Sequence, residues 1–339
     1  MRGSPPGDSS SNLKDDFMST HDIRARPHLL AGLGLAIITP LTEQGAPDLP
    51  ALEKLTARCA AGGVDVFYPL GTTGEGALLS PAERVAVVKA VVKSAGGKPV
   101  IAGAGAISTD DSVEQAKQVK DLGVDGVLIV SPPYVKPTLA GQVRHYETIA
   151  KVGLPIVAYV VPGRTALAVT APQQARLLEI DGVVAIKEAS ANLVLLAQVA
   201  AAADKLGKLV LVGDDALALP GIAVGAHGLV SVVGQLMPRA LKALVIAAMR
   251  GQRDTAIALQ RRWLDLMDAM FWETNPLPVK QALALRGECA AVWKGPLAPP
   301  EAATTEKLKT LLARLDLLVA PFAGDSEQVK LPKGQEATA

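Results

Sequence analysis

The sequence predicts an α/β protein, a (β/α)8 TIM barrel followed by a C-terminal helical extension. Eight short apolar runs have no alternation of polar and apolar residues, which is typical of parallel strands buried on both faces. Amphipathic stretches with helical spacing separate these runs, and eight such β-then-α units in about 200 residues suit the size of a barrel. After about Met237 only helical patterns remain, which indicates an extension packed on the barrel.

The predicted strands follow one another along the chain at regular intervals. They are Gly34–Ile38, Val66–Leu70, Val100–Ala102, Gly126–Val130, Ile156–Tyr159, Val183–Ile186, Leu209–Val212 and Leu229–Val232. Between the second and third, Ser80-Pro81-Ala82-Glu83 supplies a cap, a first-turn proline and an early acid, which together predict a helix start. Lys98-Pro99 and Leu154-Pro155 precede the third and fifth runs, and proline is tolerated at the start of a strand but not inside a helix.

The patterns divide the chain into four parts. We expect a disordered leader over 1–28, the barrel over 29–235, the helical extension over 236–320 and a disordered tail over 321–339, because both ends are polar. A doubly wound open sheet is the alternative for the folded part. It would need a glycine-rich phosphate loop after an early strand, and the nearest candidate, Gly103-Ala-Gly105, lacks the third glycine.

Composition narrows the classes of function. Of 339 residues, 49% are hydrophobic and only 3% aromatic, so the core must be aliphatic. The formal net charge of +1 gives no electrostatic signal for nucleic acid or an anionic membrane. The four histidines form no H-x-x-x-H pair, which argues against a zinc hydrolase, and we expect no metal. Two cysteines fit a reducing, cytoplasmic setting, and no apolar run reaches the about 18 residues that span a membrane.

One lysine stands out among the polar residues at the strand ends, where the chemistry of a barrel is found. Lys187 follows the apolar run Val183–Ile186, so we expect its amine to lie in the barrel mouth. Burial disfavours the ammonium form and lowers the pKa, and the neutral amine is a nucleophile suited to a Schiff base with a carbonyl compound. The alternative is a lysine that is only paired with Glu75, Glu188 or Asp214.

Other candidate residues fall on the same rim. The turn Gly71-Thr72-Thr73-Gly74 offers N–H groups and two hydroxyls to a carboxylate, unless it is an ordinary capped turn. Tyr134 and Tyr159 follow or end strands and are either general acid–base groups or core tyrosines. Arg164 suits a substrate carboxylate or a surface salt bridge. Gly213-Asp214-Asp215 places two acids where a phosphate-binding barrel would need an anion loop, which argues against that class.

At these positions the chain resembles the dihydrodipicolinate synthase and N-acetylneuraminate lyase family of pyruvate-dependent class I aldolases, and within it the synthases. The match runs in order from about Leu30 to Val319. Its motifs are G-T-T-G-E at Gly71–Glu75, the loop at Tyr134, Y-x-x-P-x-R-T at Tyr159–Thr165, I-K-E at Ile186–Glu188, Gly225–Ser231 and Glu273–Lys280.

The resemblance implies a lysine-imine mechanism without a cofactor. Lys187 would form the imine with pyruvate, and Thr72 and Thr73 would hold the pyruvate carboxylate. Tyr159 would donate and accept protons beside the imine. Thr73 and Tyr134 would complete a proton relay, with Tyr134 supplied by a neighbouring subunit of a homotetramer built from two tight dimers.

The family pattern also implies where the substrates lie. Arg164 would bind the carboxylate of the second substrate, which is aspartate semialdehyde in the synthases. Gly213 and Val230 would line the pyruvate pocket through main-chain groups. The product would be 4-hydroxy-tetrahydrodipicolinate, in the lysine and diaminopimelate pathway.

Several positions depart from the synthase pattern. Valine replaces an asparagine at Val135 and Val160, Gln235 replaces another, and Ala291–Pro296 replaces a short Arg-Leu-Pro-type segment. Two other functions therefore stay open: an aldolase or dehydratase of a 2-keto-3-deoxy sugar acid or another hydroxy-oxo acid, and a catalytically silent barrel that binds a keto acid. Pro133, Gly76 and Pro81 also differ from members regulated by lysine, so we expect weak or absent inhibition by lysine.

Overall fold

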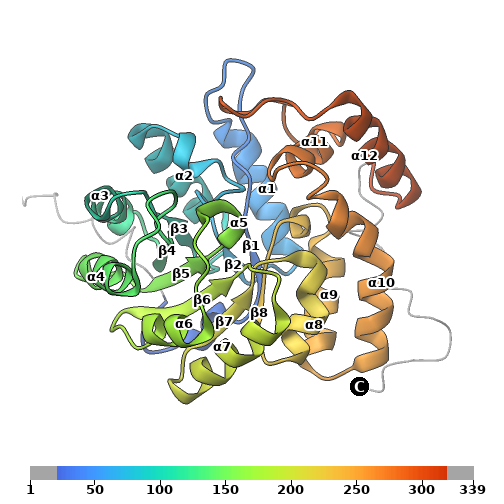
Figure 1. Cartoon of the computed structure of the whole chain (residues 1–339). Coiled ribbons are helices and arrows are strands. Elements are labelled where there is room, and N and C mark those ends of the chain that lie inside the picture. The colour runs from blue at the N-terminus through green and yellow to red at the C-terminus, as the bar shows by residue number, and fades with distance from the viewer. Residues whose placement is uncertain (1–20, 319–339) are drawn as a thin grey trace, which may run out of the picture.

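Eight parallel strands form the centre of the molecule. The computed structural model describes residues 21–318, and in it the strands follow the order β2-β1-β8-β7-β6-β5-β4-β3, while a parallel bridge between Phe67 and Val100 joins the two ends of the sheet into a barrel (Figure 1). The strands are β1 (Gly32–Leu35), β2 (Val66–Phe67), β3 (Ile101–Gly103), β4 (Gly126–Val130), β5 (Ile156–Val160), β6 (Val183–Glu188), β7 (Leu209–Val212) and β8 (Gly228–Ser231). The predicted barrel is therefore confirmed.

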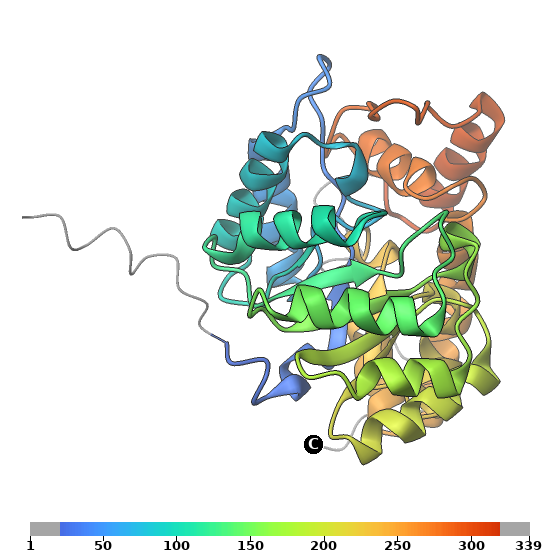
Figure 2. The same cartoon turned by 60° about the vertical axis from the view of Figure 1, so that its left-hand side comes forward.

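Helices surround the barrel and continue beyond it. Those of the barrel are α1 (Leu49–Ala61), α2 (Pro81–Ser94), α3 (Thr109–Lys120), α4 (Leu139–Ala150), α5 (Pro162–Thr165), α6 (Ala171–Leu178), α7 (Leu193–Lys205) and α8 (Ala218–Ala223). The extension adds α9 (Pro238–Met249), α10 (Arg253–Ala269), α11 (Leu277–Leu285) and α12 (Ala302–Arg314), and Figure 2 shows it as a layer against one side of the barrel. In the described chain after β8, every regular element is helical, and no helix of residues 21–318 is long and apolar enough to cross a membrane.

The strand bounds differ from the predicted ones for local reasons. The second run was expected to reach Leu70, but β2 stops at Phe67, since Pro69 has no N–H and Leu70 adopts a φ of 60°. The sixth run instead extends to Glu188, so that Lys187 lies within β6 and pairs with Leu211 of β7. Helix α2 begins at the predicted place, where Ser80 and Glu83 form a reciprocal capping box.

Apolar side chains form two clusters, one on each face of the barrel wall. The outer cluster packs the strands against the helices and includes Leu52, Val88 and Leu244. The inner cluster fills the barrel with Val66, Tyr68, Ile101, Val157, Leu211 and others. Side chains that point into the barrel therefore meet an apolar, packed interior.

The expected leader is partly structured. Residues 21–28 were predicted to be disordered, but Ile23 is buried, and it joins the inner cluster together with Leu30 of the short 3-10 helix η2 (Pro27–Leu30). His21 Nδ1 lies 3.0 Å from Asp125 Oδ1. The prediction was wrong there because Ile23, the one large apolar side chain of this polar stretch, packs into the inner cluster. The rest of the expected leader and the expected tail lie outside the described residues.

An ion pair joins the extension to the barrel. Lys280 of α11 donates to Glu75, which directly follows the turn Gly71–Gly74, and both side chains are fully buried. The second oxygen of Glu75 accepts a hydrogen bond of 2.7 Å from the backbone N–H of Lys294. Glu75 itself has a φ of 53°, in the left-handed region that non-glycine residues rarely adopt. These contacts fix the turn and the extension relative to each other.

We expect Lys280→Met to lower the free energy of unfolding by about 3–5 kcal/mol, because it leaves the Glu75 carboxylate buried without a counter-charge. The double variant Glu75→Gln/Lys280→Met should recover part of this loss, since it removes both charges. Urea unfolding followed by circular dichroism measures both. A single variant as stable as the parent protein would contradict the structural role of the pair.

Candidate active site

A cavity of about 260 Å³ opens at the carboxyl ends of the strands. It is bounded by the turn after β2, the ends of β4 and β5, and a segment of the extension near Asn275 and Pro276. Thr72, Tyr159 and Arg164 line it, three of the residues expected from the sequence. The extension was not expected to contribute to this site.

Lys187 is buried beside this cavity. It is 5% exposed, it pairs with Tyr159 across β5 and β6, and its Nζ lies 4.3 Å from the centre of the Tyr159 ring. Burial lowers the pKa of Lys187 to about 8, the charge of Asp215 opposes this shift, and Arg164 adds to it. More of the amine is therefore neutral near physiological pH than in an exposed lysine, as a nucleophile requires.

Tyr159 presents its ring to Lys187 and lines the cavity. Burial raises the pKa of the phenol, while the Arg164 charge and the Thr72 hydroxyl lower it in part. The phenol is thus protonated at neutral pH and can donate a proton to an atom bound near Lys187. The hydroxyl that interacts with it belongs to Thr72.

Thr73 has a different partner. Its Oγ1 accepts a hydrogen bond of 2.9 Å from Asn275 Nδ2, and both residues are buried. The relay was expected to run through Thr73, but the hydroxyl beside Tyr159 is that of Thr72. The two threonines are neighbours in one turn, and their side chains point to different partners, which the sequence pattern does not distinguish.

Arg164 follows β5 in the short helix α5 and reaches across to the extension. Its Nη2 donates to the Asn275 carbonyl oxygen at 2.8 Å. In residues 21–318 no carboxylate forms an ion pair with it, so its positive charge is left to act on the cavity. A guanidinium in this position suits an anionic group of a ligand.

Of the two main-chain positions that the resemblance implies, Gly213 lies against the lysine side chain. A Cβ built on Gly213 would lie 3.2 Å from Lys187 Cε and 2.6 Å from the Ala189 Cβ, so a larger residue would press on the lysine side chain. Val230 of β8 is buried inside the barrel.

Tyr134 does not reach the site within one chain. It follows β4 with a φ of 70°, and it is 86% exposed. The structure therefore brings Lys187, Tyr159, Thr72 and Arg164 together and leaves Tyr134 on the surface.

Two buried residues near the site were not given a role from the sequence. Asn275 belongs to the motif Glu273–Lys280, which lies in the C-terminal extension. Asp215 was considered only as an acid that disfavours phosphate. It is fully buried, its Oδ2 accepts N–H groups of Val232 and Val233 at 2.9 Å each, and burial raises its pKa to about 6. When ionised, its charge favours the ammonium form of Lys187. The two successive acids after a strand were the only sequence signal for it.

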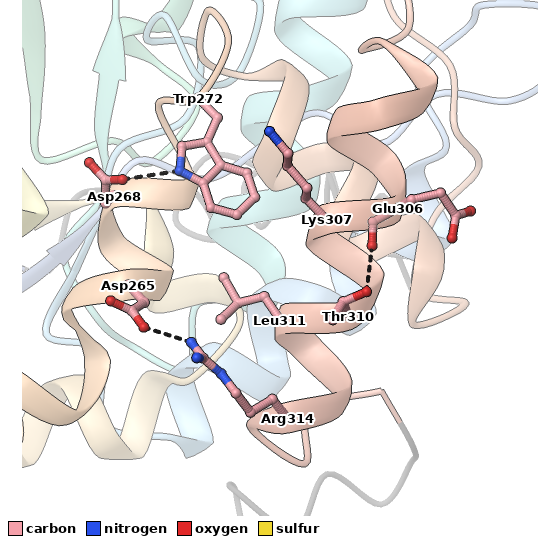
Figure 3. Close-up of a pocket in the computed structure, with 8 residues that line it drawn as sticks. All are labelled: Asp265, Asp268, Trp272, Glu306, Lys307, Thr310, Leu311 and Arg314. Atoms are coloured by element: carbon pink, nitrogen blue, oxygen red, sulfur yellow. Dashed lines mark hydrogen bonds and ion pairs between the residues drawn. The ribbon is translucent and has the colours of Figure 1, made fainter.

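A second cavity, of about 460 Å³, lies on the outer side of the extension between α10 and α12 (Figure 3). Its polar side chains are largely occupied with one another: Arg314 pairs with Asp265 at 2.6 Å, and Trp272 Nε1 donates to Asp268 at 3.0 Å (Figure 3). It offers no buried nucleophile. In residues 21–318 no group of three or more His, Cys, Asp and Glu side chains could hold a metal ion.

The barrel, the buried lysine at its mouth and the tyrosine in contact with the lysine define a class I lyase, an enzyme that works through a lysine amine. The chain belongs to the dihydrodipicolinate synthetase family, whose model matches residues 29–315. It is 42% identical over 293 residues to a 4-hydroxy-tetrahydrodipicolinate synthase of Anaeromyxobacter dehalogenans, which covers 86% of this chain and 99% of that relative. A synthase of Methanospirillum hungatei is 38% identical over 291 residues, 85% of this chain and all of the relative.

Solved structures of the same family have the same fold as this chain. Dihydrodipicolinate synthase from Aquifex aeolicus superposes with a TM-score of 0.82 at 35% identity, over 86% of this chain and 99% of that one. The enzyme from Thermotoga maritima gives a TM-score of 0.83 at 34% identity, over 86% and 100%. The resemblance found from the motifs is thereby confirmed.

We expect the Lys187 amine to react with acetic anhydride in proportion to its neutral fraction. Labelling should rise with pH and reach half of its maximum near pH 8, because the ammonium that predominates below this pH is not a nucleophile. Peptide mass spectrometry after short pulses from pH 6 to 10 measures it, with Lys187→Arg as the blank. A midpoint above pH 10 would show that the amine is not desolvated.

Proposed function

We propose that the protein condenses pyruvate with L-aspartate semialdehyde to 4-hydroxy-tetrahydrodipicolinate. The observation that supports this most strongly is the buried Lys187 amine, with its lowered pKa, in contact with Tyr159. The names of the similar proteins point to the same reaction. Pyruvate supplies the ketone for the amine, and the second substrate supplies an aldehyde and a carboxylate.

The neutral Lys187 amine attacks the ketone carbon of pyruvate, and loss of water gives a protonated imine. The imine withdraws electrons, so a methyl proton is lost and an enamine forms. The enamine carbon attacks the aldehyde carbon, and the aldehyde oxygen takes up a proton as the new C–C bond forms. The amino group of the second substrate then attacks the imine carbon and displaces Lys187, which closes the ring. Over the whole reaction one water is released.

The surrounding side chains serve these steps. Tyr159 donates the proton that leaves with water and receives the methyl proton, because its phenol is protonated and lies beside the amine. Thr72 passes protons to and from Tyr159, and Thr73 binds the pyruvate carboxylate. Arg164 binds the carboxylate of the aldehyde substrate.

Val160 packs outside the barrel interior. Val160 replaces an asparagine beside Tyr159, and this departure favoured an aldolase or dehydratase of a sugar acid. Its side chain is fully buried in the outer cluster, between strands and helices, whereas Tyr159 and Val161 belong to the inner cluster. A residue that packs on the helices does not select the ligand in the barrel mouth.

The direct test treats the protein with pyruvate and borohydride. We expect a reduced pyruvate adduct on Lys187 by peptide mass spectrometry and none in Lys187→Ala. A substrate panel then separates the candidates: condensation requires pyruvate together with aspartate semialdehyde, while a sugar-acid aldolase or dehydratase consumes a keto acid alone. An adduct without turnover of any substrate would favour the silent barrel, and no adduct would refute the proposal.

The same site gives a reason for assembly. Tyr134 and Val135 follow β4, Ile107 follows the adjacent β3, and all three are more than half exposed. A second copy packed on these loops would cover them and place Tyr134 at its neighbour's relay. We infer a tight dimer of this kind, and a homotetramer made of two such dimers.

If Tyr134 acts across the interface, inactive variants should complement each other. We expect Lys187→Ala and Tyr134→Phe each to lose at least about a hundredfold in kcat, the scale of a general acid–base contribution. Mixed and co-refolded, they should regain activity, because sites with Lys187 from one chain and Tyr134 from the other are complete. Activity assays with light scattering measure this, and the double variant mixed with Lys187→Ala is the control. No recovery in a mixed dimer would refute the shared site.

A further inference from the structure

We propose that Asn275 is a positioning residue that makes Thr73 a hydrogen-bond donor to the carboxylate of pyruvate. The inference rests on the proposed function and adds a residue from the C-terminal extension to it. Asn275 is 6% exposed and Thr73 is 2% exposed, so neither side chain has free access to water.

The direction of one hydrogen bond carries the argument. Asn275 Nδ2 donates to Thr73 Oγ1 at 2.9 Å, so the amide occupies an acceptor position of the hydroxyl. A hydroxyl has one hydrogen, which it must then direct elsewhere. An ionised carboxylate only accepts hydrogen bonds. Thr73 can therefore bind the pyruvate carboxylate only while its own O–H is not used on Asn275.

Without this contact the Thr73 hydroxyl would turn elsewhere. Buried threonine hydroxyls commonly donate to nearby backbone carbonyl groups, which compete with a ligand for the single proton. The Asn275 amide holds Thr73 Oγ1 at the site by donating to it, so that the single hydroxyl hydrogen can point to a bound carboxylate. The effect belongs to substrate binding and not to the later proton transfers at Tyr159.

The main chain of Asn275 has a separate partner. Its carbonyl oxygen accepts the 2.8 Å hydrogen bond from Arg164, the group proposed for the second carboxylate. One residue thus contacts both carboxylate-binding groups, its side chain at Thr73 and its backbone at Arg164. A substitution of the side chain changes the first contact and keeps the backbone atom of the second.

The surrounding structure holds this residue firmly. Lys280, five residues after Asn275, pairs with Glu75, which lies two residues after Thr73. The extension therefore contacts this turn and the residue after it through the amide–hydroxyl bond, the buried ion pair and the Lys294 N–H. The Glu75 contact remains in Asn275 variants, so the turn should keep its place.

Asn275→Asp and Asn275→Ala distinguish this role from simple packing. Aspartate has nearly the same shape, but it only accepts hydrogen bonds when ionised, so it takes the Thr73 proton and repels pyruvate. We expect the KM for pyruvate to rise about tenfold in Asn275→Ala and on the order of a hundredfold in Asn275→Asp. The KM for aspartate semialdehyde should stay within about twofold, because the Arg164 contact uses a backbone atom.

A packing role predicts the opposite order, since the isosteric aspartate would then be milder than alanine. Asn275→Asp with an unchanged KM for pyruvate, or equal rises for both substrates, would overturn the proposal. Thr73→Val supplies the matched background, in which Asn275→Ala should add no more than about a twofold change. Saturating pyruvate with borohydride should still label Lys187 in every variant. If the parent protein formed no reduced pyruvate adduct on Lys187, the result would instead contradict the proposed function.

Discussion

The free-energy cost of burying one ammonium group governs the chemistry of this molecule. Lys187 lies at the end of an apolar strand, where water is scarce and the charged form is disfavoured. The carboxylates of Asp215 and Glu188 could have stabilised the ammonium form. However, burial raises the pKa of Asp215 itself, and Glu188 accepts a hydrogen bond from the backbone N–H of Ser190. The amine consequently stays partly neutral, and the ring of Tyr159 is the group in direct contact with it.

The C-terminal extension contacts the candidate active site as well as the outside of the barrel. It supplies Lys280 to Glu75, Asn275 to Thr73 and a carbonyl oxygen to Arg164. A (β/α)8 barrel builds its site from the loops after its strands, and here a region outside the barrel sets the positions of those loops.

Much of the fold could be predicted from the sequence because its signal is local. Apolar runs identified all eight strands, and the burial of Lys187 followed from the run before it. The bounds of β2 depended on the left-handed φ of Leu70, which a propensity pattern does not show. Asn275 was missed as a partner of Thr73 because 202 residues separate them, and the two meet only when the extension packs on the barrel. The choice between Thr72 and Thr73 likewise required their side-chain directions.

Residues 21–28, before β1, affect where the chain can be truncated without exposing its core. The family match begins at residue 29, yet Ile23 lies upstream of it within the inner cluster, and His21 contacts Asp125 just before β4. A version that begins at residue 29 would lack Ile23, and the apolar side chains of the inner cluster that pack on it would be exposed at the end of the barrel opposite the active-site cavity. The exposed apolar surface would favour self-association at the amino-terminal end of the barrel, although every residue proposed for the reaction would still be present.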